Sequence, residues 1–153
     1  MKKKLIVAVA ALAAAAGSLV STPAAAQFAK AEDAVDYRQS AFTVMANHMG
    51  RLSAMAKGEK PFDAASAKAS AQLIETMSKL PWEAFTPGSD GGFANVKGDP
   101  WKNAEDFKSR QEKLMAETAK LPDAVSSLDG LRKQLGPTGS ACKACHDKYR
   151  VIQ

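Results

Sequence analysis

The residues with the most evident chemistry lie together near the C-terminus, in the run Cys142-Lys143-Ala144-Cys145-His146. This run contains both cysteines and one of the two histidines of the chain. The spacing C-x-x-C-H is the attachment signature of haem c. Residues three apart on a helix share one face, so the two thiols can form thioethers to the two vinyl groups of one haem. His146 can then offer an imidazole nitrogen to the iron.

Three other uses of these residues compete with haem attachment. A redox-active CxxC pair expects a thioredoxin-like βαβ context, which the sequence does not show. A zinc site needs four ligands, and His48 is the only other good ligand in the chain, while consecutive Cys-His coordination is awkward. A disulfide between residues three apart would close a short loop and stabilise little. Haem c is therefore the preferred interpretation.

The rest of the chain is expected to form helices around this motif. Good helix formers dominate the composition, and no stretch alternates apolar and polar residues in the manner of a strand. Four helical segments with short connections predict an all-α fold, an antiparallel four-helix bundle. Residues 27–153 are expected to form this single domain.

The first helix is predicted over residues 31–57. Acidic residues in its first turns suit the helix dipole, and Lys57 followed by Gly58 is a typical helix end. One apolar stripe runs along it, made of Val35, Phe42, Met45, Met49, Leu52 and Ala56.

Three further helices follow the first. The second begins after Pro61, with Asp63 as N-cap, and ends near residues 80–81; an irregular stretch over residues 81–100 comes next. The third starts near Asn103 with Phe107, Leu114 and Leu121 facing inward, and Pro122 is expected to kink or end it. The fourth runs from about residue 127 to 151, with a weak point at residues 136–137 where it is expected to bend or break.

Residues 1–26 are predicted to be a secretory signal peptide. Three lysines begin the segment, an apolar run of 12 residues extends from Leu5 to Ala16, and Ala24-Ala25-Ala26 offers a cleavage site. The run is shorter than the roughly 20 residues that span a bilayer, which disfavours a membrane anchor. We expect cleavage after Ala26, export to a bacterial periplasm, and no membrane insertion of the mature chain.

The charge of the chain argues against nucleic acid as a partner. The formal net charge is +5, but residues 1–26 hold three of the 21 lysines and arginines and none of the 16 acids. The remaining chain carries 18 basic and 16 acidic residues, a net charge of +2, with the two signs interspersed and no cationic block.

The position of the motif and its flanking segments resemble the class II c-type cytochromes, and among them the cytochromes c′. A C-terminal C-x-x-C-H in a four-helix chain is typical of this class. Pro122 and Gly136-Pro137 depart from the regular helices of the family, but they lie away from the haem motif. The matching segments span the mature chain: Ala31 to Val35, Tyr37 to Ala41, Leu80-Pro81-Trp82, Phe85, Pro87-Gly88 and Ser140 to Arg150.

The resemblance implies an apolar pocket on the open face of the iron. Phe42 matches the central pocket position, and Met45, Trp82 and Phe85 match other pocket positions. Apolar residues on the inner stripe of a helix would also form the core of any bundle, so the pocket assignment depends on the family match.

The resemblance also implies polar contacts to the haem. Arg38 and Gln39 match positions that contact the haem propionates, and an Arg–carboxylate pair is chemically sensible there. Arg150 lies one helical turn after His146 and matches a position beside the proximal haem face. The alternative is that these three side chains are ordinary solvated residues of helix faces or ends.

The sixth coordination position of the iron sets the expected function. Cytochromes c′ leave this position empty, and Phe42 cannot ligate iron, so we expect a five-coordinate, high-spin haem with His146 as its axial ligand. Such a site binds NO or CO, in the family sometimes on the proximal side after His146 is displaced. The alternative is a low-spin electron carrier with Met45 or Met49 as sixth ligand.

His48 lies about 120° around the helix from Phe42 and is expected at the surface or an interface.

The expected physiological role is NO binding or detoxification, together with a capacity for electron transfer to a periplasmic redox partner. No catalytic residue and no enzyme activity are expected, because peroxidase chemistry uses a distal acid–base group, usually His with Arg nearby. The family resemblance further implies a homodimer through the first two helices.

Overall fold

The first helix matches its prediction at both ends. In the computed structural model, which describes residues 27–92 and 95–151, α1 spans Ala31–Lys57. Glu32 and Asp33 lie in its first turn, where negative charge is favourable. Gly58 ends it with a left-handed backbone, and its N–H donates to the Met55 carbonyl at 3.1 Å. The predicted signal peptide, residues 1–26, lies outside the described residues.

The second helix, α2, spans Ala64–Met77 and begins at its predicted N-cap. The Asp63 carboxylate accepts the Ser66 N–H at 2.7 Å. Ala67 and Ala71 are fully buried, and their small side chains let α2 pack closely along α1.

The stretch predicted to be irregular contains one short 3₁₀ helix, η1 (Pro81–Ala84), and otherwise turns and loops where it is described. At Gly92 the loop passes so close to α1 that an added Cβ would lie 2.4 Å from the Val35 Cγ1 atom. Farther along, Val96 forms an antiparallel bridge with Arg150. This isolated bridge is the only β-type pairing within residues 27–92 and 95–151.

The third helix ends before its proline. α3 spans Ala104–Thr118, and a separate short helix, α4, spans Leu121–Ala124. Pro122 lies in the first turn of α4, where a missing N–H breaks no helical hydrogen bond. Leu121, predicted to face inward, is fully buried.

The last helix is continuous, so the expected weak point at residues 136–137 does not break it. α5 spans Leu128–Tyr149, and the Ser127 hydroxyl caps it by accepting the Gly130 N–H at 3.0 Å. Pro137 lies inside the helix on its exposed side. Water can therefore satisfy the Lys133 carbonyl, which loses its helical N–H donor at the proline.

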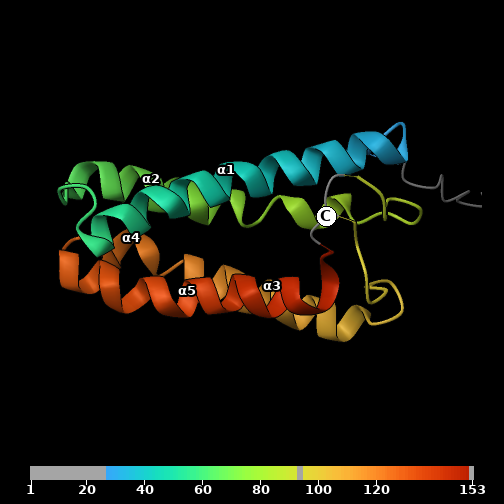
Figure 1. Ribbon diagram of the computed structural model, residues 1–153. Coiled ribbons are helices and arrows are strands. Elements are labelled where there is room, and N and C mark those ends of the chain that lie inside the picture. Colours follow the sequence, from blue (N-terminus) through green and yellow to red (C-terminus); the bar gives the residue numbers. More distant parts are fainter. Residues whose placement is uncertain (1–26, 93–94, 152–153) are drawn as a thin grey trace, which may run out of the picture.

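The four long helices form the antiparallel bundle predicted from the sequence. α1 and α2 run side by side in one half, and α3 and α5 in the other (Figure 1). The core has two parts. One cluster fills the end of the bundle at α4 and contains Leu52, Ala67, Ala71, Ile74, Leu121, Val125 and Leu131. The other lies nearer the C-terminal end of α5 and contains Met45, Leu114 and Ala141, with Phe42, Met77, Trp82 and Cys142 packed against it.

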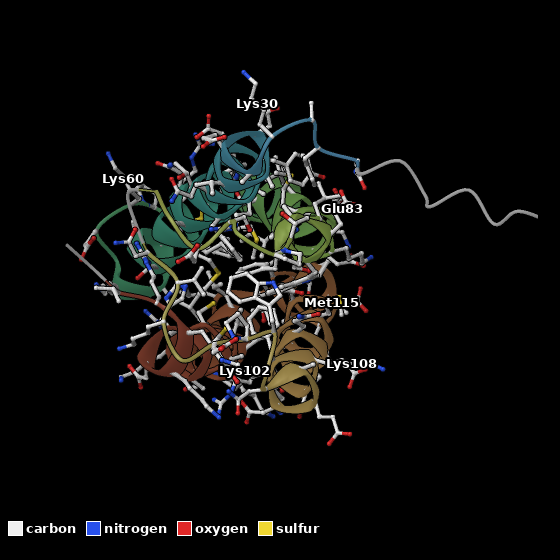
Figure 2. All side chains as sticks on the ribbon, turned by 90° about the vertical axis from the view of Figure 1, so that its right-hand side faces the viewer. Lys30, Lys60, Glu83, Lys102, Lys108 and Met115 are labelled. Atoms are coloured by element: carbon white, nitrogen blue, oxygen red, sulfur yellow. The ribbon has the colours of Figure 1, made fainter. Side chains whose placement is uncertain are left out.

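The view along the bundle shows side chains filling its centre, while Lys30 and Lys60 point outward (Figure 2). None of the helices in the described ranges combines the length and the apolar character needed to cross a membrane.

Candidate functional site

A cavity of about 450 Å³ lies in the half of the bundle that holds the C-x-x-C-H motif. Side chains from α1, η1, α3 and α5 and from residues flanking them surround it. All ten residues predicted to contact the cofactor line this cavity: Arg38, Gln39, Phe42, Met45, Trp82, Phe85, Cys142, Cys145, His146 and Arg150. The structure therefore brings the predicted set together, while the role of each residue stays a prediction.

The cavity also has lining residues outside the predicted set. Met49, Phe107 and Leu114 are among the residues expected to face inward. Two more could have been found from spacing, because Gly139 lies three residues before Cys142 and Tyr149 lies three after His146, on the face of the motif. Val96 belongs to an irregular segment and carries no such signal. The additional lining residues are Thr43, Ala46, Met49, Val96, Phe107, Leu114, Gly139 and Tyr149.

The two cysteines are half-buried on α5 and form no disulfide. Burial raises the pKa of both thiols, that of Cys145 to about 11. Both are therefore neutral thiols near pH 7, on one face of the helix and beside the cavity.

His146 follows Cys145 directly and is also half-buried. Burial lowers the pKa of its imidazole, and the nearby Arg150 lowers it further. The neutral imidazole, which has a free nitrogen lone pair for a metal, is therefore favoured. Its backbone is held as well, since the His146 carbonyl accepts the Arg150 N–H at 3.0 Å.

Aromatic side chains form a continuous wall of the cavity. Phe42 meets Trp82 edge-on with ring centroids 5.7 Å apart, and Trp82 stacks on Phe85 at 6.1 Å. Phe107 continues the series from Phe85 at 4.8 Å to Tyr149 at 5.0 Å. The wall therefore reaches from α1 to the end of α5.

Arg38 is 2% exposed and holds the loop that follows η1. Its guanidinium donates to the Ala84 carbonyl at 3.0 Å, to the Ser89 hydroxyl at 2.8 Å and to the Ser89 carbonyl, and it lies 4.8 Å from the centre of the Phe85 ring. Burial lowers the pKa of Arg38, and Asp90 opposes this effect. The side chain thus places a buried positive charge at the cavity, while its contact to a propionate stays a prediction.

His48 does not line the cavity. It is half-buried on α1, and its Nδ1 atom is buried without a hydrogen-bond partner. Burial lowers its pKa, and Arg51 adds to this effect. The side chain is less exposed than a surface histidine, and it is not placed to reach a group bound in the cavity.

The residues fit the cofactor that the motif implies. Two neutral thiols and a neutral imidazole line a largely apolar cavity, and its volume lies within the range of about 300–1,000 Å³ typical of cofactor sites. The alternatives fit less well. In the part of the chain that is described, no group of three or more His, Cys, Asp or Glu side chains could hold a metal ion, and no βαβ unit surrounds the CxxC pair.

Comparisons with known proteins agree with this reading over almost the whole described chain. The sequence profile of the family described as "Cytochrome C'" matches residues 33–150. A cytochrome c′ from Alcaligenes xylosoxydans xylosoxydans is 48% identical over 126 residues, which are 81% of this chain and 98% of the relative.

Two solved structures of variants of cytochrome c prime from Alcaligenes xylosoxidans share the fold. One is a nitric oxide complex, with a TM-score of 0.76 and 46% identity over 83% of this chain and 100% of that chain. The other is a carbon monoxide-bound form, with a TM-score of 0.75 and 47% identity over 81% of this chain and 98% of that chain.

Proposed function

The chain belongs to the cytochrome c′ family, and we propose that it is an exported cytochrome that binds NO and CO at an open coordination position. Haem c is the covalent cofactor of this family. In our proposal Cys142 and Cys145 would hold the haem through thioethers to its two vinyl groups, and His146 would bind the iron through an imidazole nitrogen. When bound, the haem supplies a redox-active iron with one position left for a diatomic ligand.

The observation that carries this proposal is the apolar part of the cavity wall. Phe42, Met45 and Phe85 have no side-chain hydrogen-bond donor, and the Trp82 N–H already donates to the Ser78 carbonyl at 2.7 Å. Bound O₂ becomes polar and gains from a distal donor, whereas NO and CO need one much less. This part of the wall therefore favours NO and CO, the two ligands held by the related structures.

Electron transfer is the second candidate function, and one observation favours it. Met45 and Met49 both line the cavity. A thioether sulfur on the iron in both oxidation states would keep the coordination constant and so lower the reorganisation energy. In this alternative the protein is a low-spin carrier for a periplasmic redox partner.

The proposal assigns no catalytic residue. Peroxidase chemistry uses a distal acid–base group, usually His with Arg nearby. His48 does not line the cavity, and the Arg38 guanidinium is committed to the loop after η1. The side chains that do line the apolar wall exclude water and crowd the open face without moving protons.

The proposal also covers the cellular location of the protein and its oligomeric state. The lysines, apolar run and small residues of positions 1–26 support export to the periplasm with cleavage after Ala26. Residues 27–153 would then be the mature domain. A homodimer through α1 and α2 follows from the family resemblance, and light scattering of the mature protein tests it.

The decisive experiment is the absorption spectrum of the haem-loaded protein, ferric and then ferrous, before and after anaerobic NO. High-spin spectra that change on NO addition are expected. Low-spin spectra with a Met–iron charge-transfer band, unchanged by NO, would overturn the proposal in favour of electron transfer. In that case Met45→Ala and Met49→Ala would identify the ligand, because only the variant that lacks it would become high-spin.

A further inference from the structure

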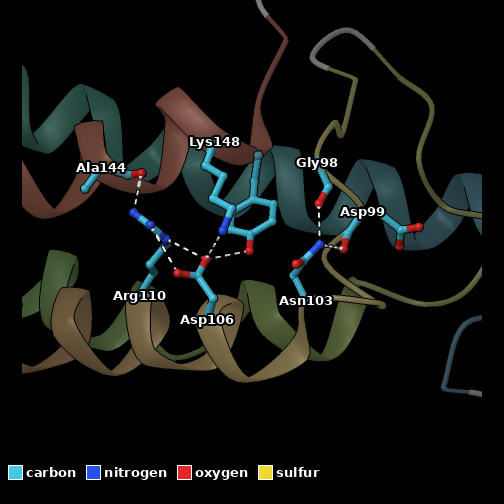
Figure 3. A network of polar contacts seen from close by, with 8 residues as sticks. Gly98, Asp99, Asn103, Asp106, Arg110, Ala144 and Lys148 are labelled. Atoms are coloured by element: carbon cyan, nitrogen blue, oxygen red, sulfur yellow. Dashed lines mark hydrogen bonds and ion pairs between the residues drawn. The ribbon is translucent and has the colours of Figure 1, made fainter.

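Polar side chains join α3 to the last turns of α5, beside the C-x-x-C-H motif (Figure 3). The Asp106 carboxylate accepts from Arg110 Nε at 2.9 Å and Nη2 at 3.2 Å, from Lys148 Nζ at 3.0 Å and from the Tyr149 hydroxyl at 2.6 Å. Arg110 Nη1 donates in addition to the Ala144 carbonyl at 2.8 Å. Two residues of α3 thus hold three residues of α5.

These contacts lie on both sides of His146 along the helix. Ala144 is inside the motif, two residues before His146, while Lys148 and Tyr149 follow it by two and three residues. A helix held at only one point can still turn about its axis or shift along it. Contacts before and after His146 restrict both movements of the turn that carries the imidazole.

The side chain of Asp106 is 39% exposed, but the network is joined to a buried ring and so differs from an ordinary surface ion pair, which contributes little to a structure. Tyr149 is 4% exposed and lines the cavity, and its ring packs edge-on against Phe107 at 5.0 Å. Arg110 pairs with Asp106 through two N–H groups, a geometry with fixed orientation. Arg110, then Tyr149 and Lys148, hold the pKa of Asp106 well below its usual range, so the carboxylate stays charged.

The position of the network matters because α5 ends at Tyr149, three residues after His146. The last turn of a helix lacks hydrogen-bond partners for its carbonyls and frays unless other contacts hold it. Residues 95–97 supply a second tie there: the Lys97 N–H donates to the Tyr149 carbonyl at 3.1 Å, and the Val151 N–H to the Asn95 carbonyl at 2.8 Å. On the side of this turn that faces α3, Asp106 and Arg110 supply the hydrogen bonds, and Phe107 supplies the ring contact to Tyr149.

We propose that Arg110 and Asp106 are positioning residues that set the orientation of the His146 imidazole toward the cavity, and through it the strength of the bond from His146 to the iron. This inference rests on the proposed function, which makes His146 the axial ligand. Neither residue lines the cavity, so neither touches a group bound there, and both position His146 through the turn of α5 that they hold.

The test uses Arg110→Met, which keeps a long side chain and removes every donor. Resonance Raman spectra of the ferrous, haem-loaded protein report the Fe–His stretching band, and a redox titration reports the reduction potential. Relative to wild type, we expect the band to shift and broaden and the potential to change by more than the spread of repeat preparations. Lys108→Met is the matched control, because Lys108 is also on α3 and its 3.7 Å ion pair with Glu112 stays within that helix.

An unchanged Fe–His band in Arg110→Met would overturn the inference even if the potential or the melting temperature changed, because the network would then act only through its charge or through the stability of the bundle. An equal change in Lys108→Met would also overturn it. If Arg110→Met does not load haem, Arg110→Lys and Asp106→Asn take its place. The lysine keeps the charge but cannot bridge Asp106 and Ala144 in the same way, so an intermediate shift supports the inference and wild-type bands in both variants refute it. A wild-type protein without an Fe–His band would instead refute the proposed function.

Discussion

Phe42 on α1 meets Trp82 of η1 edge-on, with ring centroids 5.7 Å apart and ring planes at 72°. The Trp82 indole is itself fixed, because its N–H donates to the Ser78 carbonyl at 2.7 Å, its ring stacks on Phe85, and it meets Phe107 in a T-shaped contact. The fixed Trp82 ring therefore restricts movement of the Phe42 side chain. Its position on the cavity wall is set by packing, and a ligand that enters the cavity must share space with it.

Replacing this ring should open the cavity. We expect Phe42→Ala to raise the association rate of CO with the ferrous protein about tenfold, equivalent to about 1.4 kcal/mol in the barrier. Stopped-flow absorption after mixing with CO measures the rate. Thr43→Ala is the control, because Thr43 is the next residue on α1, lines the same cavity and is exposed. Equal rates in Phe42→Ala and wild type would contradict steric crowding by Phe42.

Three helix ends could be predicted because local chemistry determines them, whereas α2 ends at Met77, before the predicted residues 80–81. Gly58 supplies the left-handed backbone that ends α1, and Asp63 and Ser127 supply side-chain oxygens for the first turns of α2 and α5. The effect of a proline depends instead on its surroundings. Pro137 leaves α5 continuous because it lies on the solvent side, which the sequence pattern around it does not reveal.

The cavity could be predicted from the motif, from helical spacing and from the family resemblance, but the network beside it could not. In the sequence, Asp106 and Arg110 form an i,i+4 pair of a kind that usually lies on a solvated face of a helix. Their contacts to Ala144 and Tyr149 depend on how α3 packs against α5, as the position of Val96 depends on the path of an irregular loop. Such tertiary relationships leave no periodic signal.

Mass spectrometry can test whether Cys142 and Cys145 are the residues that attach the haem. Cys142→Ser and Cys145→Ser should each keep one thioether, so each denatured chain should still carry the mass of one haem. The double variant should carry none, because no thiol remains. Intact mass spectrometry after denaturation measures this, with Ser140→Ala, a change at an exposed residue of the same helix, as control. Haem that stays bound to the denatured double variant would rule out attachment through these two thiols.

Glu117 should make stability depend on acid pH. Its side chain is 5% exposed and accepts from Lys113 Nζ at 2.8 Å, Gln134 Nε2 at 2.9 Å and Lys120 Nζ at 3.0 Å. These contacts, that of Lys113 first, lower the pKa of Glu117 from 4.5 to about 2. Because the folded pKa is the lower one, the stabilisation is complete above pH 4.5 and is lost as the pH falls toward 2.

The measurement for Glu117 is the melting temperature of the haem-loaded protein against pH, for wild type and Glu117→Gln. We expect the wild type to be more stable at pH 6 and the two curves to converge as the pH falls from 4.5 toward 2. Glu112→Gln changes a largely exposed carboxylate on the same helix, and its curve should run parallel to that of wild type. A constant difference between wild type and Glu117→Gln would show that the Glu117 carboxylate is not the source of the pH dependence.

Comparing alanine substitutions at two glycines distinguishes the cost of backbone strain from the cost of a close contact. Gly58 follows α1, and Gly98 lies against the end of α5. Gly58 and Gly98 both have positive φ, 79° and 70°, but an added Cβ meets nothing within 4 Å at Gly58 and lies 2.6 Å from the Lys148 carbonyl oxygen at Gly98. Gly58→Ala should therefore lower the free energy of unfolding by about 1 kcal/mol, from strain alone. Gly98→Ala should cost more, because the contact pushes residues 95–98 away from α5.

Urea unfolding of the haem-loaded protein compares the two variants, and hydrogen exchange locates the change. The N–H groups of Lys97 and Val151, which pair with Tyr149 and Asn95, should exchange faster in Gly98→Ala and at the wild-type rate in Gly58→Ala. Equal free energies and equal exchange in the two variants would mean that residues 95–98 move aside without loosening their tie to α5. Faster exchange confined to Gly98→Ala would show that this loop holds the backbone next to Arg150, and so the end of the helix that carries His146.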